Sequence, residues 1–224
     1  MERLRVGVLI SGRGSNLQAL IEACRDPDYP AEIVLVISNR AQAPGLARAD
    51  AAGIPHAIVG HRERHAFAAQ AEALLREHRV DFICLAGFMR ILDAGFVQAW
   101  RDRMVNIHPS LLPAFQGLHA QRQALAAGVR FTGCTVHFVR AELDCGPIIG
   151  QAVVPVRPDD DEERLSARIL EVEHRLYPLA LRLIAEKRVT VTADRVDIEG
   201  WRSPEIAALN PVGPAAGRFA RTSV

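Results

Sequence analysis

Short runs of consecutive apolar residues alternate, in the first half of the chain, with stretches whose apolar residues recur at helical spacing. The apolar runs predict buried strands at residues 6–10, 33–37, 57–59 and 82–86. Helices are predicted at residues 15–24, 45–52 and 65–78. Because the strand runs are continuous rather than alternating, both faces of their sheet should be covered. This half therefore predicts an open, mostly parallel sheet with helices on both faces, an α/β fold.

The second half has a different pattern. A strand stub is predicted at 104–107, a helix at 117–127, strands at 131–139 and 148–156, a long helix from 159–163 to about 187, and a hairpin at 189–198. The two longer strands should pair antiparallel. The acidic start of the long helix suits the positive end of the helix dipole. We expect residues 1–200 to form a single domain, with halves at about 1–102 and 103–200, and residues 201–224, rich in Pro, Ala and Gly, to fray.

Composition narrows the class of partner. The 27 basic and 26 acidic residues nearly cancel, which argues against a nucleic acid or an anionic membrane as main partner and leaves small anions possible. The four cysteines form no C-x-x-C pair, and no disulfide framework is expected. No signal-peptide core is apparent, and the longest apolar run, residues 82–89, is too short for a bilayer. We therefore expect a protein of a reducing compartment, the cytoplasm.

A glycine-rich turn, Ser11-Gly12-Arg13-Gly14-Ser15-Asn16, joins the first strand to the first helix. Converging backbone N–H groups at a helix start favour an anion, so a phosphate is the natural guest. The turn is not a dinucleotide fingerprint, since Leu17 stands where a third glycine is needed, and no P-loop Gly-Lys-Ser/Thr follows. The alternative is an ordinary tight turn whose Ser15 caps the helix.

A second candidate, Gly87-Phe88-Met89-Arg90-Ile91-Leu92, follows the strand at 82–86. Ligands of open parallel sheets bind beyond the carboxyl ends of the strands. This loop could hold a flat, apolar-edged heterocycle, although periodicity alone favours a packed loop.

Three polar groups carry candidate chemistry. Asn106 and His108 are two residues apart at a strand end, so both side chains can project to one side. Asp144 lies in a later Leu-Asp-x-Gly-Pro turn and could orient the histidine. An amide donor, an imidazole and a carboxylate together can stabilise an oxyanion and move protons, as acyl transfer requires. The alternative is a structural histidine. Ser110 lacks the context of a hydrolase nucleophile.

Several stretches, taken together, resemble the phosphoribosylglycinamide formyltransferases of purine biosynthesis. The resemblance covers about residues 4–190 in order, and the matching stretches are residues 9–19, 85–92, 106–113, 132–139, 143–149 and 173–178. The family implies a Rossmann-like formyltransferase fold. It also implies that 10-formyltetrahydrofolate donates a formyl group to the amine of glycinamide ribonucleotide, without a metal.

The resemblance assigns roles to particular residues. Asn106 would donate to the developing oxyanion, His108 would act as general acid and electrostatic stabiliser, and Asp144 would favour the charged imidazolium. The ribonucleotide phosphate would bind at Gly14, Ser15 and Asn16, in the N-terminal half, with Glu173 near the ribose. The residues implied to contact folate, mostly in the C-terminal half, are Arg64, Met89, Arg90, Ile91, Leu92, Asn106, Arg140, Ala141, Glu142, Leu143 and Asp144.

One position departs from the family pattern: Leu170 stands where some relatives carry a polar group near the ribose. The charge balance and the resemblance together predict the partners. We expect small molecules, with no nucleic acid or membrane, and a monomer or homodimer.

Three other functions compete with this interpretation. A formyltetrahydrofolate hydrolase usually has an extra N-terminal domain and a second histidine where this chain has Pro109. A methionyl-tRNA formyltransferase has a sizeable C-terminal RNA-binding domain, which we do not expect in the residues after Arg188, because they are few and hold no basic cluster. A non-catalytic nucleotide-binding module would explain the glycine turn, but it gives no reason for Asn106, His108 and Asp144.

Overall fold

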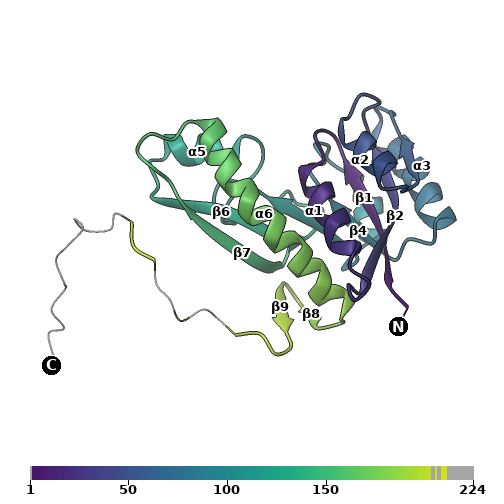
Figure 1. The fold of residues 1–224 in the computed structure, drawn as a ribbon. Helices are drawn as coiled ribbons and strands as arrows, with labels where there is room; N and C mark the ends of the chain where they lie inside the picture. The colour runs from purple at the N-terminus through teal and green to yellow at the C-terminus, as the bar shows by residue number, and fades with distance from the viewer. Residues whose placement is uncertain (1, 203–204, 206–207, 211–224) are drawn as a thin grey trace, which may run out of the picture.

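The computed structural model describes residues 2–202, 205 and 208–210. Seven strands form one sheet in the order β3-β2-β1-β4-β5-β6-β7, and β8 and β9 form a separate hairpin (Figure 1). The strands are β1 (Leu4–Ile10), β2 (Ala31–Ser38), β3 (His56–Ile58), β4 (Phe82–Leu85), β5 (Met104–His108), β6 (Phe131–Phe138), β7 (Ile148–Pro155), β8 (Val189–Thr192) and β9 (Arg195–Ile198). The helices are α1 (Ser15–Cys24), α2 (Gly45–Ala51), α3 (Arg64–Glu77), α4 (Ala94–Ala99), α5 (Ala120–Ala126) and α6 (Glu162–Ala185).

The pairing directions confirm the predicted fold class. Strands β3, β2, β1, β4 and β5 are parallel, and β6 and β7 add an antiparallel portion. The strand order reverses between β1 and β4, because β2 lies on one side of β1 and β4 on the other. In open α/β sheets ligands bind in the crevice beyond the strand ends at such a reversal. The fold therefore places the glycine-rich turn after β1 beside the loop after β4.

Two apolar clusters cover the two faces of the sheet. One joins the strands to α1, α2 and α6, and the other joins them to α3 and α4. Successive strand residues point to opposite faces, so Val105 and Ile107 of β5 belong to the first cluster and Met104 to the second. Figure 1 shows α1 and α6 side by side over the first face. The prediction that both faces are covered is confirmed.

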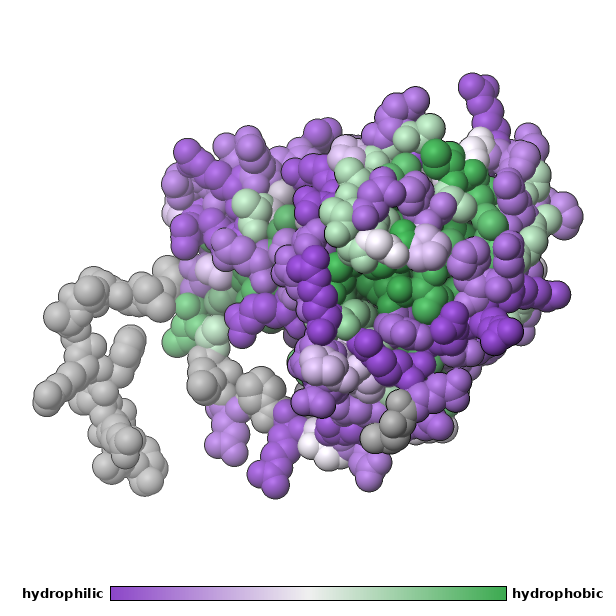
Figure 2. Space-filling view, turned by 45° about the vertical axis from the view of Figure 1, so that its right-hand side comes forward, coloured by the Kyte–Doolittle hydropathy of each residue, from purple (hydrophilic) through white to green (hydrophobic). Residues whose placement is uncertain are grey.

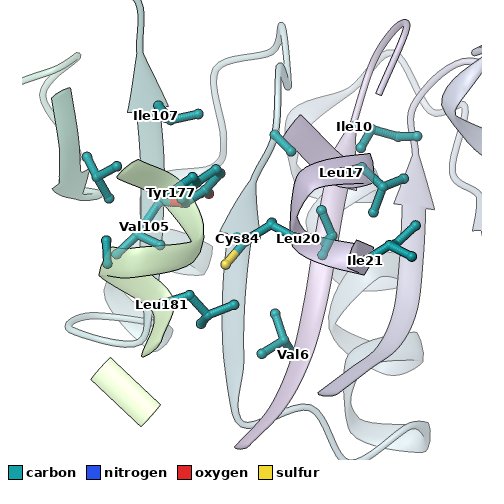
Figure 3. Packing of buried hydrophobic residues seen from close by; sticks show 14 of the residues in the cluster. Val6, Ile10, Leu17, Leu20, Ile21, Cys84, Val105, Ile107, Tyr177 and Leu181 are labelled. Atoms are coloured by element: carbon teal, nitrogen blue, oxygen red, sulfur yellow. The ribbon is translucent and has the colours of Figure 1, made fainter. Parts of the chain in front are cut away.

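Tyr177 anchors α6 to the centre of the sheet. Its ring is fully buried between α6 and the strands (Figure 3). Its hydroxyl donates to the carbonyl oxygens of Leu85 at 2.9 Å and Val105 at 3.3 Å. A buried hydroxyl costs free energy unless it finds a partner. These hydrogen bonds therefore offset the cost of burying the Tyr177 hydroxyl among apolar side chains, and they fix α6 over β4 and β5.

Three details differ from the sequence prediction. Ser15 is the first residue of α1 and does not cap it; Gly14 stands at the cap position with φ 70°, and no side chain caps the helix. Helix α4 was missed, because its six residues are too few to show a period, although Asp93 caps it through the N–H groups of Gly95 and Phe96. The predicted helix at 117–127 begins only at Ala120, since Gly117 and His119 have positive φ.

The remaining predictions concern the cysteines, the surface and the tail. All four cysteines are free, and Cys84 and Cys134 are buried. No helix in the described part of the chain is long and apolar enough to cross a membrane. The face in Figure 2 is mostly polar, with one hollow in which apolar side chains gather. The prediction that residues 201–224 fray falls largely outside the described residues.

The close approach of β6 and β7 gives a stability prediction. A Cβ at Gly133 would lie 1.8 Å from the Ala152 carbonyl oxygen, so the two backbones would have to separate. We expect Gly133→Ala to lower the free energy of unfolding by at least about 2 kcal/mol, measured by urea denaturation. Gly60→Ala is the matched control, because a Cβ there meets nothing within 4 Å. A Gly133→Ala chain as stable as the control would contradict this account of the β6–β7 packing.

Candidate active site

A direct hydrogen bond joins the two loops that meet at the strand-order reversal, the loop after β1 and the loop after β4. The Ser11 hydroxyl oxygen accepts a hydrogen bond from the Met89 N–H at 2.8 Å. Gly14 has φ 70°, and a Cβ on it would lie 2.7 Å from the Gly45 Cα. Only glycine therefore fits between the starts of α1 and α2. The N–H groups at the start of α1 have no helical partners, which suits an anion.

Asn16 and Glu173 meet at the α1–α6 contact. The Asn16 Nδ2 donates to Glu173 Oε2 at 2.7 Å, and both side chains are buried. Burial raises the pKa of Glu173 to about 7, although the hydrogen bond from Asn16 acts in the opposite direction. Within the described part of the chain, Asn16 Oδ1 is buried and has no hydrogen-bond partner. Near the start of α1, the pair thus offers the Glu173 carboxyl group, which can be either protonated or ionised near neutral pH, and the Asn16 Oδ1, which can accept a hydrogen bond.

Asn106 and His108 lie on the face of the sheet opposite α6. They alternate with Val105 and Ile107, which pack under α6. On the neighbouring antiparallel strand, His137 stands opposite Asn106 and Thr135 opposite His108. The apolar cluster of α3 and α4 includes no residue of β5 beyond Met104. This end of the face is therefore lined by polar side chains and covered by loops instead of a helix.

Asp144 closes the site from the loop between β6 and β7. Its backbone is left-handed, with φ 52°, and its Oδ2 accepts a hydrogen bond from the Gly117 N–H at 2.9 Å. The same oxygen lies 3.4 Å from His108 Nδ1, and Oδ1 lies 3.7 Å from His137 Nε2. The three side chains are at most 7% exposed. The structure therefore places Asp144 beside His108, which sequence spacing alone could not establish.

The surroundings of His108 suit a charged ring. Its Nε2 lies 2.9 Å from the Phe115 carbonyl oxygen. A carbonyl only accepts hydrogen bonds, so Nε2 carries a proton. Nδ1 faces the Asp144 carboxylate. A doubly protonated ring thus has an acceptor for each N–H, and the site can hold an imidazolium.

His137 is a site residue that sequence reasoning did not single out. Its Nε2 lies 3.3 Å from Asn106 Nδ2, and its Nδ1 lies 3.0 Å from the Phe138 carbonyl oxygen. Burial is the main effect on His137 and lowers its pKa, while the Phe138 carbonyl and the Asp144 charge act in the opposite direction. The residue lies within a stretch matching the family. The register that sets it opposite Asn106, however, becomes visible only when β5 and β6 are paired.

Several of the residues predicted to contact folate are exposed to solvent, whereas two arginines of the same set already have hydrogen-bond partners. Met89, Ile91 and Leu143 are 62%, 54% and 56% exposed, which is unusual for large apolar side chains. Leu92 is half-buried, Ala141 and Glu142 are exposed, and Arg64 is the first residue of α3. Free apolar surface is thus available in both loops.

The two other arginines in that set are already engaged. The Arg90 guanidinium donates to the carbonyls of His61 and Arg62, the latter at 2.6 Å, and lies 5.0 Å from the centre of the Phe67 ring. Arg140 donates to Asp102 Oδ1 at 2.6 Å. Their side chains stabilise the loops and most of their donor groups are used, although the Arg140 Nε is buried without a hydrogen-bond partner in the described part of the chain.

Among the described residues, no group of three or more His, Cys, Asp or Glu side chains is placed to hold a metal ion. The fold and these side chains together define a class: an open α/β protein with an amide–imidazole–carboxylate cluster at the end of β5 and a glycine-rich turn after β1.

Comparisons with known proteins specify the class further. The formyl transferase family model matches residues 4–181, so the chain belongs to the formyl transferase family. Phosphoribosylglycinamide formyltransferase of Escherichia coli is 43% identical over 204 residues, covering 90% of this chain and 96% of that protein. The crystal structure of glycinamide ribonucleotide transformylase 1 from Symbiobacterium toebii is 51% identical, with a TM-score of 0.84, and covers 88% of this chain and 94% of that one.

A longer relative matches equally well over one of its parts. The trifunctional purine biosynthetic protein adenosine-3 of Drosophila melanogaster is 52% identical over 197 residues. The match covers 86% of this chain but only 15% of the relative's length.

The buried Glu173 gives a prediction about pH. Its carboxyl binds a proton more tightly in the folded chain, where the pKa is about 7, than in the unfolded chain, where it is about 4.5. Its contribution to stability is therefore greatest at low pH and falls as pH rises from about 4.5 to about 7. In urea denaturation, Glu173→Gln should gain about 3 kcal/mol relative to wild type between pH 4.5 and pH 8.

Glu171→Gln provides the matched control for this experiment, since Glu171 is exposed on the same helix. It should follow wild type at every pH. Parallel stability curves for wild type and Glu173→Gln would contradict the proposed burial effect.

Proposed function

We propose that this protein transfers the formyl group of 10-formyltetrahydrofolate to the amine of glycinamide ribonucleotide, giving formylglycinamide ribonucleotide and tetrahydrofolate in de novo purine biosynthesis. The observation that carries the proposal is the gathering of Asn106, His108 and Asp144 at one end of β5. Family membership and similarity to phosphoribosylglycinamide formyltransferases over nearly their whole length support it. The same support extends to a folate co-substrate.

Formyl transfer requires the protein to stabilise an oxyanion and to protonate the departing nitrogen. The substrate amine attacks the formyl carbon, its lone pair forms the new C–N bond, and the carbonyl electrons move onto oxygen. The Asn106 amide donates a hydrogen bond to that oxyanion. The intermediate collapses when the bond to N10 of the folate breaks. His108, as imidazolium paired with Asp144 through Nδ1, supplies positive charge and gives its Nε2 proton, released from the Phe115 carbonyl, to the departing nitrogen. The proton lost by the attacking amine passes to water.

The acceptor's phosphate would bind at Gly14, Ser15 and Asn16. Unpartnered N–H groups at the start of α1 and the helix dipole both favour an anion there. Glu173, hydrogen-bonded to Asn16 at 2.7 Å, would take a ribose hydroxyl. Leu170, half-buried one turn earlier on α6, offers no polar group to that ligand. The acceptor is therefore held mainly by backbone groups and Glu173.

The donor's flat ring would lie between the loop after β4 and the loop 140–144. Met89, Ile91 and Leu143 supply exposed apolar surface, with Leu92 beside them. Arg90, Arg140, Ala141 and Glu142 would contribute backbone groups, because both guanidinium groups already have partners. Arg64 at the start of α3 would face the folate tail, and Asn106 and Asp144 would lie near the formyl group.

The proposed function also implies a division of the chain and a place of action. Residues 1–200 would act as one domain, about 1–102 holding the phosphate and about 103–200 the folate and the catalytic groups. The enzyme would work in the cytoplasm on small molecules, without a metal, as a monomer or a homodimer.

The function is tested by an assay with 10-formyltetrahydrofolate, with and without glycinamide ribonucleotide. Formyl transfer that depends on the amine is the expected result. Release of tetrahydrofolate without the amine would instead indicate a hydrolase, and no reaction would indicate a binding module. Either of these outcomes would overturn the proposal.

Removing the catalytic groups should leave the fold intact. We expect His108→Ala to lose most of its turnover, and Asn106→Ala to lose on the order of a hundred- to a thousandfold in kcat, because each removes a group that acts on the transition state. His56→Ala, an exposed histidine on β3, is the control. Thermal unfolding of each variant checks that the fold is kept. Near-normal turnover in His108→Ala would rule out its proposed role.

A further inference from the structure

We propose that His137 is a positioning residue: its bare Nε2 accepts a hydrogen bond from the Asn106 amide and so holds the Asn106 donor toward the reacting carbonyl. The contact joins Asn106 Nδ2 to His137 Nε2 at 3.3 Å across the β5–β6 pair. The inference rests on the proposed role of Asn106 as oxyanion donor, and it assigns to His137 an action through Asn106 alone.

The tautomer of His137 follows from its other neighbour. Nδ1 lies 3.0 Å from the Phe138 carbonyl oxygen, which can only accept a hydrogen bond. The ring proton is therefore on Nδ1, and in the neutral ring Nε2 is left as a lone pair. An amide N–H is the complementary partner for that lone pair. The second N–H on the same Asn106 nitrogen then remains for a substrate oxygen.

A lost acceptor would free the Asn106 amide. An amide side chain presents either its nitrogen or its oxygen in a given direction after a half-turn. With Oδ1 in the place of Nδ2, an oxygen would face the oxyanion, and the interaction would be repulsive. The His137 Nε2 selects against that arrangement, because lone pairs of Oδ1 and Nε2 would then oppose one another.

The two histidines beside Asp144 are thus unlike. His108 has an acceptor for each of two N–H groups, Phe115 O and Asp144 Oδ2. His137 has an acceptor at Nδ1 and a donor at Nε2, with Asp144 Oδ1 farther away at 3.7 Å. A proton on Nε2 of His137 would be drawn to Asp144 and would expel the Asn106 N–H. The negative charge of Asp144 therefore stabilises a proton on His108, and His137 stays neutral.

Burial of His137 supports the neutral ring. It is the largest influence on the residue and lowers its pKa, and the charge of His108 acts in the same direction. The Phe138 carbonyl and Asp144 act oppositely. The Phe138 carbonyl accepts from Nδ1 of His137, which carries the proton in the neutral tautomer, so this hydrogen bond does not require a charged ring.

A double-mutant cycle tests the inference. His137→Leu should lower kcat roughly tenfold or more, up to the loss seen in Asn106→Ala, with KM for both substrates nearly unchanged. His137→Gln, whose carbonyl can replace Nε2 as acceptor, should recover most of that loss. In the Asn106→Ala background, His137→Leu should cause no further loss. Independent, multiplicative losses, or a Gln variant as slow as Leu, would overturn the inference.

The control is His78→Leu. His78 is half-buried, lies away from the site, and places its Nδ1 3.0 Å from a backbone carbonyl, that of Leu74. It should keep wild-type kcat. If His137→Leu does not fold, the nitrogen-15 shifts of His137 in the wild-type protein at neutral pH decide. A protonated Nδ1 and a bare Nε2 are expected, and a protonated Nε2 would overturn the inference.

Failure of the proposed function is distinguishable from failure of this inference. An Asn106→Ala chain with full activity would remove the role of Asn106, whatever the state of His137. An impaired Asn106→Ala chain beside a fully active His137→Leu chain would remove only the role of His137.

Discussion

The arrangement of the active site depends on one buried carboxylate. Asp144, on a left-handed turn, accepts the Gly117 N–H at 2.9 Å and lies 3.4 Å from His108 and 3.7 Å from His137. It thereby joins the loop after β5, strands β5 and β6, and the loop before β7. A buried charge is costly unless neighbouring charges and donors compensate it. The Gly117 N–H provides part of that compensation, and in the proposed mechanism a protonated His108 provides the rest, so electrostatics and loop position are coupled.

The sheet separates this site from the part that carries most of the packing. On one face, α1 and α6 bury apolar residues, and Tyr177 bonds to the carbonyls of β4 and β5. On the other face, beyond Met104, polar residues of β5 and β6 meet two loops. A rigid strand pair thus positions Asn106 and His108, and the loops can vary around them. Glu173 belongs to the first face and links that packing to the proposed acceptor site.

Much of the fold could be predicted from local patterns, because continuous apolar runs mark buried parallel strands and helical spacing marks α1, α3 and α6. Asn106 and His108 were identified because they share a strand end. Pairing across strands has no local signal, so the register that sets His137 opposite Asn106 could not be inferred. Likewise, Arg90 and Arg140 were predicted as ligand residues, and their engagement with His61, Arg62 and Asp102 depends on tertiary contacts. Helix α4 was too short to show a period.

The most direct test of the central claim is the single-turnover rate of formyl transfer to glycinamide ribonucleotide by Asp144→Asn. Asparagine keeps the size of the side chain and an acceptor for the Gly117 N–H, but it removes the charge that pairs with His108. The account predicts a rate lower by roughly a hundredfold or more, with thermal unfolding close to that of wild type. A rate near that of wild type would contradict the claim that this carboxylate organises the catalytic groups.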